Sequence, residues 1–102
     1  MYILVKSDIP DKLVPVITAH ASLACFRQYE HTPNMQAWIS GIFKKVVCAV
    51  NETEFQNAKK ESEHIILTES ALDNIEVCIA FSPREEYSKM FRFLKMWTPQ
   101  NV

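Results

Sequence analysis

The residues best suited to chemistry at the start of the chain are Asp8 and Lys12, in the polar segment after the apolar run MYILVK. Both lie in the expected connection between a strand and a helix. In α/β proteins, ligands bind at the carboxyl ends of the strands. A loop lysine is a mobile point charge suited to a phosphate or an oxyanion. The alternative is that Asp8 binds loop amides and Lys12 is solvated, and the sequence leaves both interpretations open.

His20 is the second candidate, within a segment of small residues that reads as a helix. Its neighbours at helical spacing are apolar or small, namely Val16, Ile17, Leu23 and Ala24. We therefore expect one side of the imidazole to meet the core. A packed, hydrogen-bonded histidine is favoured over a catalyst, because burial alone explains the pattern.

A third polar segment contains Glu69, Ser70 and Asp73, between two strand-like runs. Short polar residues at such a position usually form only a turn. The other histidines, His31 and His64, have no metal-ligand spacing to a cysteine or an acid. We predict no metal site.

Composition limits the classes of function. The chain has 102 residues, 48% of them hydrophobic, and a formal net charge of -1. One domain with its own core fits this length, and the charge is unlike that of a strongly basic nucleic-acid binder. Gly41 is the single glycine, so neither a GxGxxG motif nor a P-loop is present. We predict no cofactor.

The cysteines Cys25, Cys48 and Cys78 are dispersed, without CxxC spacing, in segments that read as helix or strand. Free, buried thiols in a reducing compartment are expected from this pattern. The amino terminus has no apolar stretch of signal-peptide length, and no run approaches membrane-spanning length. We expect a cytoplasmic protein without a membrane partner.

Apolar periodicity and capping residues indicate the elements that must position these side chains. Strands are expected at 1–6, 44–50, 64–68 and 75–81, and helices at 15–31, 35–40, 52–62 and from 82 onward. The order is β-α-α-β-α-β-β-α. The predicted fold is a three-layer α/β domain, with a four-stranded mixed sheet and helices on both faces.

Two helix starts carry strong local signals. Residues 51–54, Asn-Glu-Thr-Glu, resemble a capping box, and Ser82 followed by Pro83 combines an N-cap with proline at the first helical position. The last helix would carry an apolar stripe of Tyr87, Met90, Phe91, Leu94 and Trp97. Basic residues could form a phosphate-facing surface, although a solvated face is the favoured interpretation: Lys44, Lys45, Arg84, Lys89, Arg92 and Lys95.

Several local strings are similar to one known family. They are LVKSD from Leu4, HASLACFRQY from His20, Trp38 followed by KKVV from Lys44, and IAFSP from Ile79. With the element order above, the chain resembles the type-2 peptidyl-tRNA hydrolases over nearly its whole length, residues 1–102. The family's Gly-rich loop is shorter here and lacks glycine, its glutamine is Ile17, and its Asp-Ala-Gly-x-Thr segment is reduced to Glu69-Ser70-Ala71.

The resemblance implies hydrolysis of the ester that links a peptide to the 3′ end of tRNA. In that reaction Lys12 would contact phosphate or the oxyanion, Asp8 and Glu69 would orient water or the lysine, and His20 would line the pocket floor. We assign these residues as catalytic, and the substrate-binding set as Lys6, Thr18, Ser70 and Lys44. Activity is expected to depend on Asp8 and Lys12 more than on His20.

Two other functions remain open. The chain could be an inactive member of the fold that binds a small molecule, an RNA end or a protein, or it could be a structural dimerisation module. A homodimer is expected in any case, because aromatic residues such as Phe43, Phe91, Phe93 and Trp97 exceed what a small core covers. The expected partners are therefore tRNA or another RNA end, and a second copy of the chain.

Overall fold

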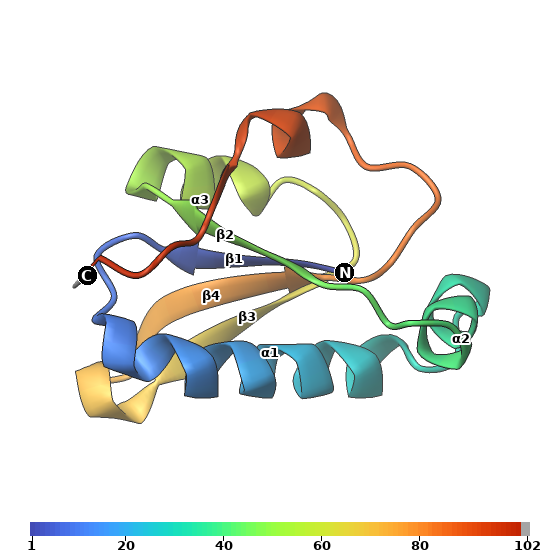
Figure 1. Ribbon diagram of the computed structural model, residues 1–102, viewed down its shortest axis with the longest axis horizontal. Helices are drawn as coiled ribbons and strands as arrows, with labels where there is room; N and C mark the ends of the chain where they lie inside the picture. Colours follow the sequence, from blue (N-terminus) through green and yellow to red (C-terminus); the bar gives the residue numbers. More distant parts are fainter. Residues whose placement is uncertain (101–102) are drawn as a thin grey trace.

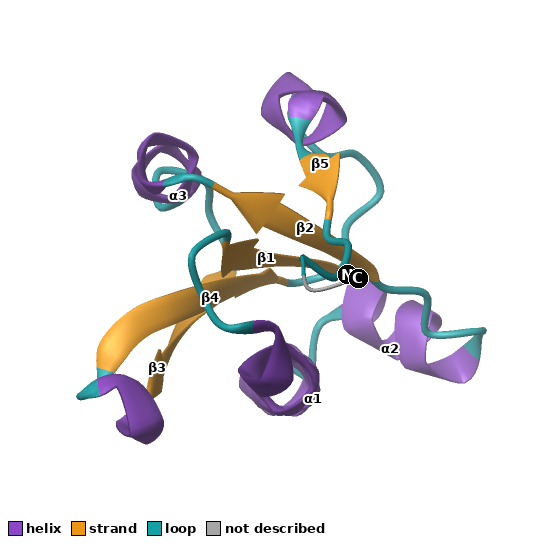
Figure 2. Cartoon of the chain, turned by 60° about the vertical axis from the view of Figure 1, so that its left-hand side comes forward, coloured by secondary structure: helices purple, strands orange, loops and turns teal. Residues whose placement is uncertain are grey.

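One mixed sheet organises the computed structural model, which describes residues 1–100. Its strands are β1 (Tyr2–Lys6), β2 (Val46–Val50), β3 (His64–Glu69), β4 (Ile75–Phe81) and β5 (Lys95–Met96). They lie in the order β3-β4-β1-β2-β5. β1 and β2 run parallel, whereas the other neighbouring strands are antiparallel. Figures 1 and 2 show this sheet between layers of helix.

The helices lie on both faces of the sheet (Figure 1). They are α1 (Val14–Tyr29), α2 (Pro33–Ser40) and α3 (Glu52–Ala58), with short 3₁₀ helices η1 (Asp11–Leu13), η2 (Ser70–Leu72) and η3 (Lys89–Phe93). α1 covers one face and α3 the other. The mixed α/β domain predicted from the sequence is therefore confirmed.

The core consists of two layers because side chains of a strand alternate between faces. Ile3 and Val5 of β1 face the cluster that includes α1, while Leu4 faces the cluster that includes Phe55 of α3. All four side chains are fully buried. On α1 the buried residues include small ones such as Ala21, which lets the helix lie close to the sheet.

The helix predicted from Ser82 onward is wrong. Residues 82–88 form neither helix nor strand, and the short helix η3 follows them. β5 then adds an edge strand beside β2, so the sheet has five strands instead of four. The predicted order β-α-α-β-α-β-β-α is therefore wrong at its last element. Tertiary contacts outweigh the local helix signal. Tyr87 and Phe91 both pack on Tyr2, with ring centroids 4.7 and 4.8 Å away.

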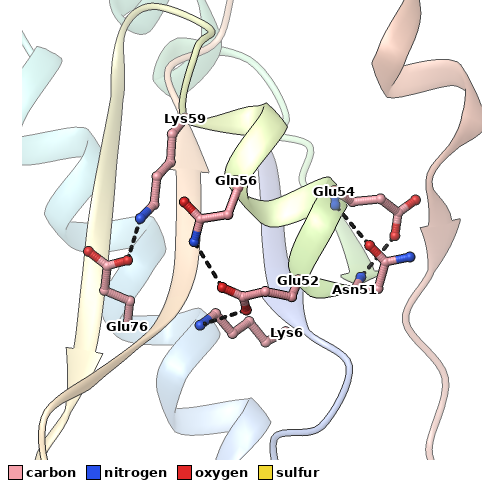
Figure 3. A network of polar contacts seen from close by, with 7 residues as sticks. All are labelled: Lys6, Asn51, Glu52, Glu54, Gln56, Lys59 and Glu76. Carbon is pink, nitrogen blue, oxygen red and sulfur yellow. Dashed lines mark hydrogen bonds and ion pairs between the residues drawn. The ribbon is translucent and has the colours of Figure 1, made fainter.

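The capping box predicted at residues 51–54 is confirmed. The Glu54 amide donates to Asn51 Oδ1 at 2.8 Å, and the Asn51 amide donates to Glu54 Oε1 at 2.8 Å (Figure 3). Each bond satisfies an amide that a helix terminus would otherwise leave unpaired. The helix is shorter than expected and ends at Ala58.

The three cysteines are free and buried, as predicted. Desolvation by burial raises the pKa of Cys25 to about 11 and that of Cys78 to about 12, from an ordinary value of 9.0. Burial also raises the pKa of Cys48. The thiols therefore keep their protons in the folded chain at pH values where an unfolded chain begins to lose them. No helix within residues 1–100 is long and apolar enough to cross a membrane.

These raised pKa values predict that the free energy of unfolding falls as pH rises. Above about pH 9 the unfolded thiols ionise, and this favours unfolding until the pH passes the folded-state values. Urea unfolding at about pH 8 and about pH 10 should show the decline. The slope should be shallower in Cys25→Ala, which removes one of the titrating groups. An equal slope in parent and variant would contradict a contribution from Cys25.

Candidate functional site

A groove lies between α1 and the end of β3. Its volume is about 460 Å³, within the range of roughly 300–1,000 Å³ usual for ligand sites. Its lining residues are Ile17, His20, Leu23, Ala24 and Arg27 of α1, with Leu67, Thr68, Glu69, Ser70 and Asn74 of the β3–β4 region. One wall is therefore a helix face and the other is the end of an edge strand.

The α1 wall follows from helical spacing. His20, Ala24 and Arg27 stand four and seven residues apart, so they share one face. The fully buried Ala21 and Cys25 lie on the face that meets the sheet. The carboxyl end of α1 is tied to the start of β3, where Tyr29 Oη donates to the His64 carbonyl at 3.1 Å. This bond fixes the end of α1 beside the start of β3.

The prediction that His20 packs against the core is wrong. The residue is exposed and lines the groove. The apolar neighbours that suggested burial divide between environments: Ile17 is 3% exposed, but Val16 is 53% and Leu23 is 61% exposed. The helix rotation therefore turns the imidazole toward solvent and toward the β3 wall.

The β3 wall is held by a tight polar turn. A register shift between Leu67 and Thr68 precedes it. Glu69 Oε2 then accepts hydrogen bonds from the Ala71 amide at 3.1 Å and from Ser70 Oγ at 3.4 Å, which caps η2. The Asn74 amide donates to the Glu69 carbonyl at 2.9 Å and closes the turn. Both of these side-chain bonds use Oε2, so Oε1 of this carboxylate takes part in neither.

The tight turn also needs unusual backbone. Asp73 and Asn74 have φ values of 56° and 60°, in the left-handed region that asparagine and aspartate tolerate better than most residues. The sequence interpretation of Glu69, Ser70 and Asp73 as a turn is thus confirmed. The same turn presents Glu69, Ser70 and Asn74 to the groove.

The groove therefore combines an imidazole, a carboxylate, a guanidinium and a hydroxyl with an apolar surface from Ile17, Leu23 and Leu67. Such a combination can hold an amphiphilic ligand and exchange a proton with it. Arg27, Thr68 and Asn74 were not expected here. Arg27 could have been found from its spacing of seven residues after His20, which places it two turns further along the same face.

Two of the predicted catalytic residues do not line this groove. Asp8 and Lys12 are exposed in the β1–α1 connection, where a turn is closed by the Ile9 amide bonding to the Lys6 carbonyl at 3.2 Å. The following short helix η1 then leads into α1. The connection lies at the end of the sheet where β1 finishes, but the groove is formed further along α1 and against β3.

Lys6 faces the opposite side of the sheet. Its Nζ lies 3.1 Å from Glu52 Oε2 (Figure 3). The same atom lies 4.6 Å from the centre of the Phe55 ring. Hydrogen bonds from Gln56 and Lys6 lower the pKa of Glu52. Side chains of a strand alternate between its two faces, so Lys6 lies on the same face of β1 as Leu4, two positions earlier. This is the face opposite α1.

The other predicted substrate-binding residues divide among different places. Thr18 Oγ1 donates to the Pro15 carbonyl at 3.0 Å and is not among the groove-lining residues. Lys44 lies at the opposite end of the sheet, before the start of β2. Of the predicted site, the structure brings together His20, Glu69 and Ser70.

No group of three or more histidine, cysteine, aspartate or glutamate side chains within residues 1–100 is arranged to hold a metal ion. Comparisons with known proteins add no assignment: no protein-family model matches this sequence. No curated protein matches it at a significant level either.

The exposure of His20 predicts that its removal hardly changes stability. His20→Ala should alter the free energy of unfolding by no more than about 0.5 kcal/mol, as is usual for an exposed side chain. Ile17→Ala, one turn earlier and buried, should cost about 2–5 kcal/mol through lost burial and a cavity. Urea unfolding of both variants measures the difference. If His20→Ala lowers the free energy of unfolding by more than about 1 kcal/mol, His20 contributes to packing after all.

Proposed function

We propose that the chain is an ester hydrolase of the type-2 peptidyl-tRNA hydrolase class, acting on a peptide or aminoacyl group esterified to the 3′ end of tRNA. The observation that carries the proposal is that His20, Glu69 and Ser70 line one groove. These are three of the residues assigned to the site through the resemblance. Conversion of such an ester requires a positioned proton acceptor and polar groups around the reacting carbonyl.

The chemistry assigns a different role to each wall of the groove. His20 accepts a proton from water, whose oxygen attacks the ester carbonyl carbon. The carbon–oxygen bond to the ribose then breaks, the proton passes to the departing 3′ oxygen, and the products are a free carboxylic acid and an RNA hydroxyl. Glu69 orients the water or the imidazole through its carboxylate, and Arg27 opposes the negative charge that develops on the carbonyl oxygen or is carried by a neighbouring phosphate.

The apolar part of the groove supports an acyl ligand. Ile17, Leu23 and Leu67 contribute a surface on which an amino-acid or peptide side chain can be buried. Burial of such a side chain contributes to binding through the hydrophobic effect without demanding one particular residue type. This suits a substrate whose peptide part varies.

The proposal predicts loss of activity when the groove is altered. With purified peptidyl-tRNA, His20→Ala and Glu69→Gln should reduce peptide release by about 100- to 10,000-fold, the usual contribution of a general acid–base group. His31→Ala is the matched control, because His31 has a side chain 95% exposed and lies outside the groove lining. Lys12→Ala tests the expectation that activity depends on the charges of the β1–α1 connection more than on His20.

The outcomes separate the candidate sites. Loss in Lys12→Ala with full activity in His20→Ala would move the reaction to the β1–α1 connection. No peptide release by the parent chain, with an authentic hydrolase active in parallel, would overturn hydrolysis altogether. The alternative is then an inactive binding module. One observation favours it: the Glu69 carboxylate already caps η2 through the Ala71 amide and Ser70 Oγ.

We also propose that the chain forms a homodimer. An apolar surface lies over α2 and the residues that follow it, where Ile39 is 39% and Phe43 is 50% exposed. These residues line a second groove of about 420 Å³ whose only charged lining residue among those described is Lys45. A second copy of the same chain would cover this surface and remove its apolar area from water.

Light scattering at micromolar concentration should therefore give twice the chain mass of 11.8 kDa. Ile39→Glu should shift the protein to the monomer, because a carboxylate buried in this apolar interface loses hydration, a cost that pairing with Lys45 offsets only in part. Glu52→Gln, on the exposed side of α3, is the control for a changed charge. A monomeric parent, or a dimer unaffected by Ile39→Glu, would contradict this assignment of the interface.

A further inference from the structure

Another cavity lies at the other end of the sheet, where β1 and β2 begin. Its volume is about 260 Å³ and its lining residues are Met1, Tyr2, Trp38, Lys44, Val46, Pro83, Arg84 and Tyr87. These come from the start of the chain with β1, from α2, from β2 with the segment before it, and from the segment after β4. None of them lines the groove of His20.

The cavity carries positive charge without a paired carboxylate. Lys44 and Arg84 line it, and none of the ion pairs found within residues 1–100 involves either side chain. The guanidinium of Arg84 is fixed by backbone: Nε donates to the Ser82 carbonyl at 3.0 Å and Nη2 to the Glu63 carbonyl at 3.0 Å. Carbonyl oxygens orient this cation but leave its full charge in place.

The aromatic rings of Tyr2, Trp38 and Tyr87 form much of the remaining wall, and the polar atoms of Trp38 and Tyr87 have partners. Trp38 Nε1 donates to the Lys44 carbonyl at 2.7 Å, and Tyr87 Oη donates to the Ser82 carbonyl at 3.2 Å. Tyr2 packs edge-on against Tyr87 with ring centroids 4.7 Å apart. The rings are therefore held in place. The Arg84 guanidinium already lies over the Tyr87 ring, 5.1 Å from its centre, so a ligand base would meet the rings of Tyr2 and Trp38.

We propose that this cavity binds one nucleotide, with its phosphate between Lys44 and Arg84 and its base or ribose against the aromatic wall. Lysine and arginine bind phosphate through charge-assisted hydrogen bonds, and bases stack on aromatic rings without a strict sequence requirement. The volume of about 260 Å³ is just under the usual lower limit of roughly 300 Å³ for ligand sites. At this size we expect the cavity to hold one nucleotide at most.

The nucleotide can be free or part of an RNA strand, and the same contacts serve both. Calorimetric titration of the full chain with AMP, adenosine and inorganic phosphate tests the two halves of the site. AMP should bind at least about 10-fold more tightly than either fragment, because only AMP uses both the cations and the rings. Affinity should fall as salt rises, since a phosphate contact is screened.

Variants locate the binding. Lys44→Ala and Arg84→Gln should each weaken AMP binding by about 10-fold or more, the usual effect of losing a charged hydrogen-bond donor. Lys60→Ala, an exposed lysine outside the cavity, is the matched control. His20→Ala should leave AMP binding unchanged, so this result is independent of the proposed hydrolysis.

A short single-stranded RNA distinguishes the source of the nucleotide. RNA binding that Lys44→Ala weakens, in the absence of AMP binding, assigns the cavity to a nucleotide within a strand. Equal binding of AMP and free phosphate would overturn the role of the aromatic wall. Failure of both AMP and RNA to bind, or binding that is equal in parent and Lys44→Ala, would overturn the site.

Discussion

The burial of β1 on both faces is the constraint on which the rest of the structure depends. Ile3, Leu4 and Val5 are all fully buried, so this strand must be central and both of its faces must be covered by other elements. Its pairing with β2 is parallel, and a parallel neighbour requires a crossover connection. That connection carries α1 and α2. This connection supplies residues to both the His20 groove and the cavity lined by Lys44 and Arg84.

Elements whose signal is local were predictable from the sequence. The β1 and β4 runs are apolar throughout or alternate in polarity, and the capping box at Asn51 stabilises its own helix start through neighbouring residues. The segment after Ser82 was not predictable in this way. Its Tyr87 and Phe91 gain their partner Tyr2 from the other end of the chain, and no local pattern encodes that contact.

In the candidate site too, some residues could be placed from local sequence and others could not. Glu69 and Ser70 could be placed because they follow a strand and form a turn with its own hydrogen bonds. The face of His20 could not be placed, because apolar residues surround it on every side of α1 and two of them, Val16 and Leu23, are exposed. Lys44 has the positive charge that a phosphate-binding site needs, but it precedes β2. Because β2 runs parallel to β1, the start of β2 lies at the end of the sheet opposite the carboxyl end of β1.

The register shift between Leu67 and Thr68 has a consequence beyond the shape of the groove. β3 is the outermost strand on its side, so its outer backbone groups form an edge on which another chain could add a strand. Between Leu67 and Thr68 the pairing moves from Cys78 to Glu76, so the extra residue is Val77 of β4 and β3 itself has no insertion. A bulge increases the local twist of the strand pair, and a twisted β3 is a poorer template for a flat partner strand than a straight one.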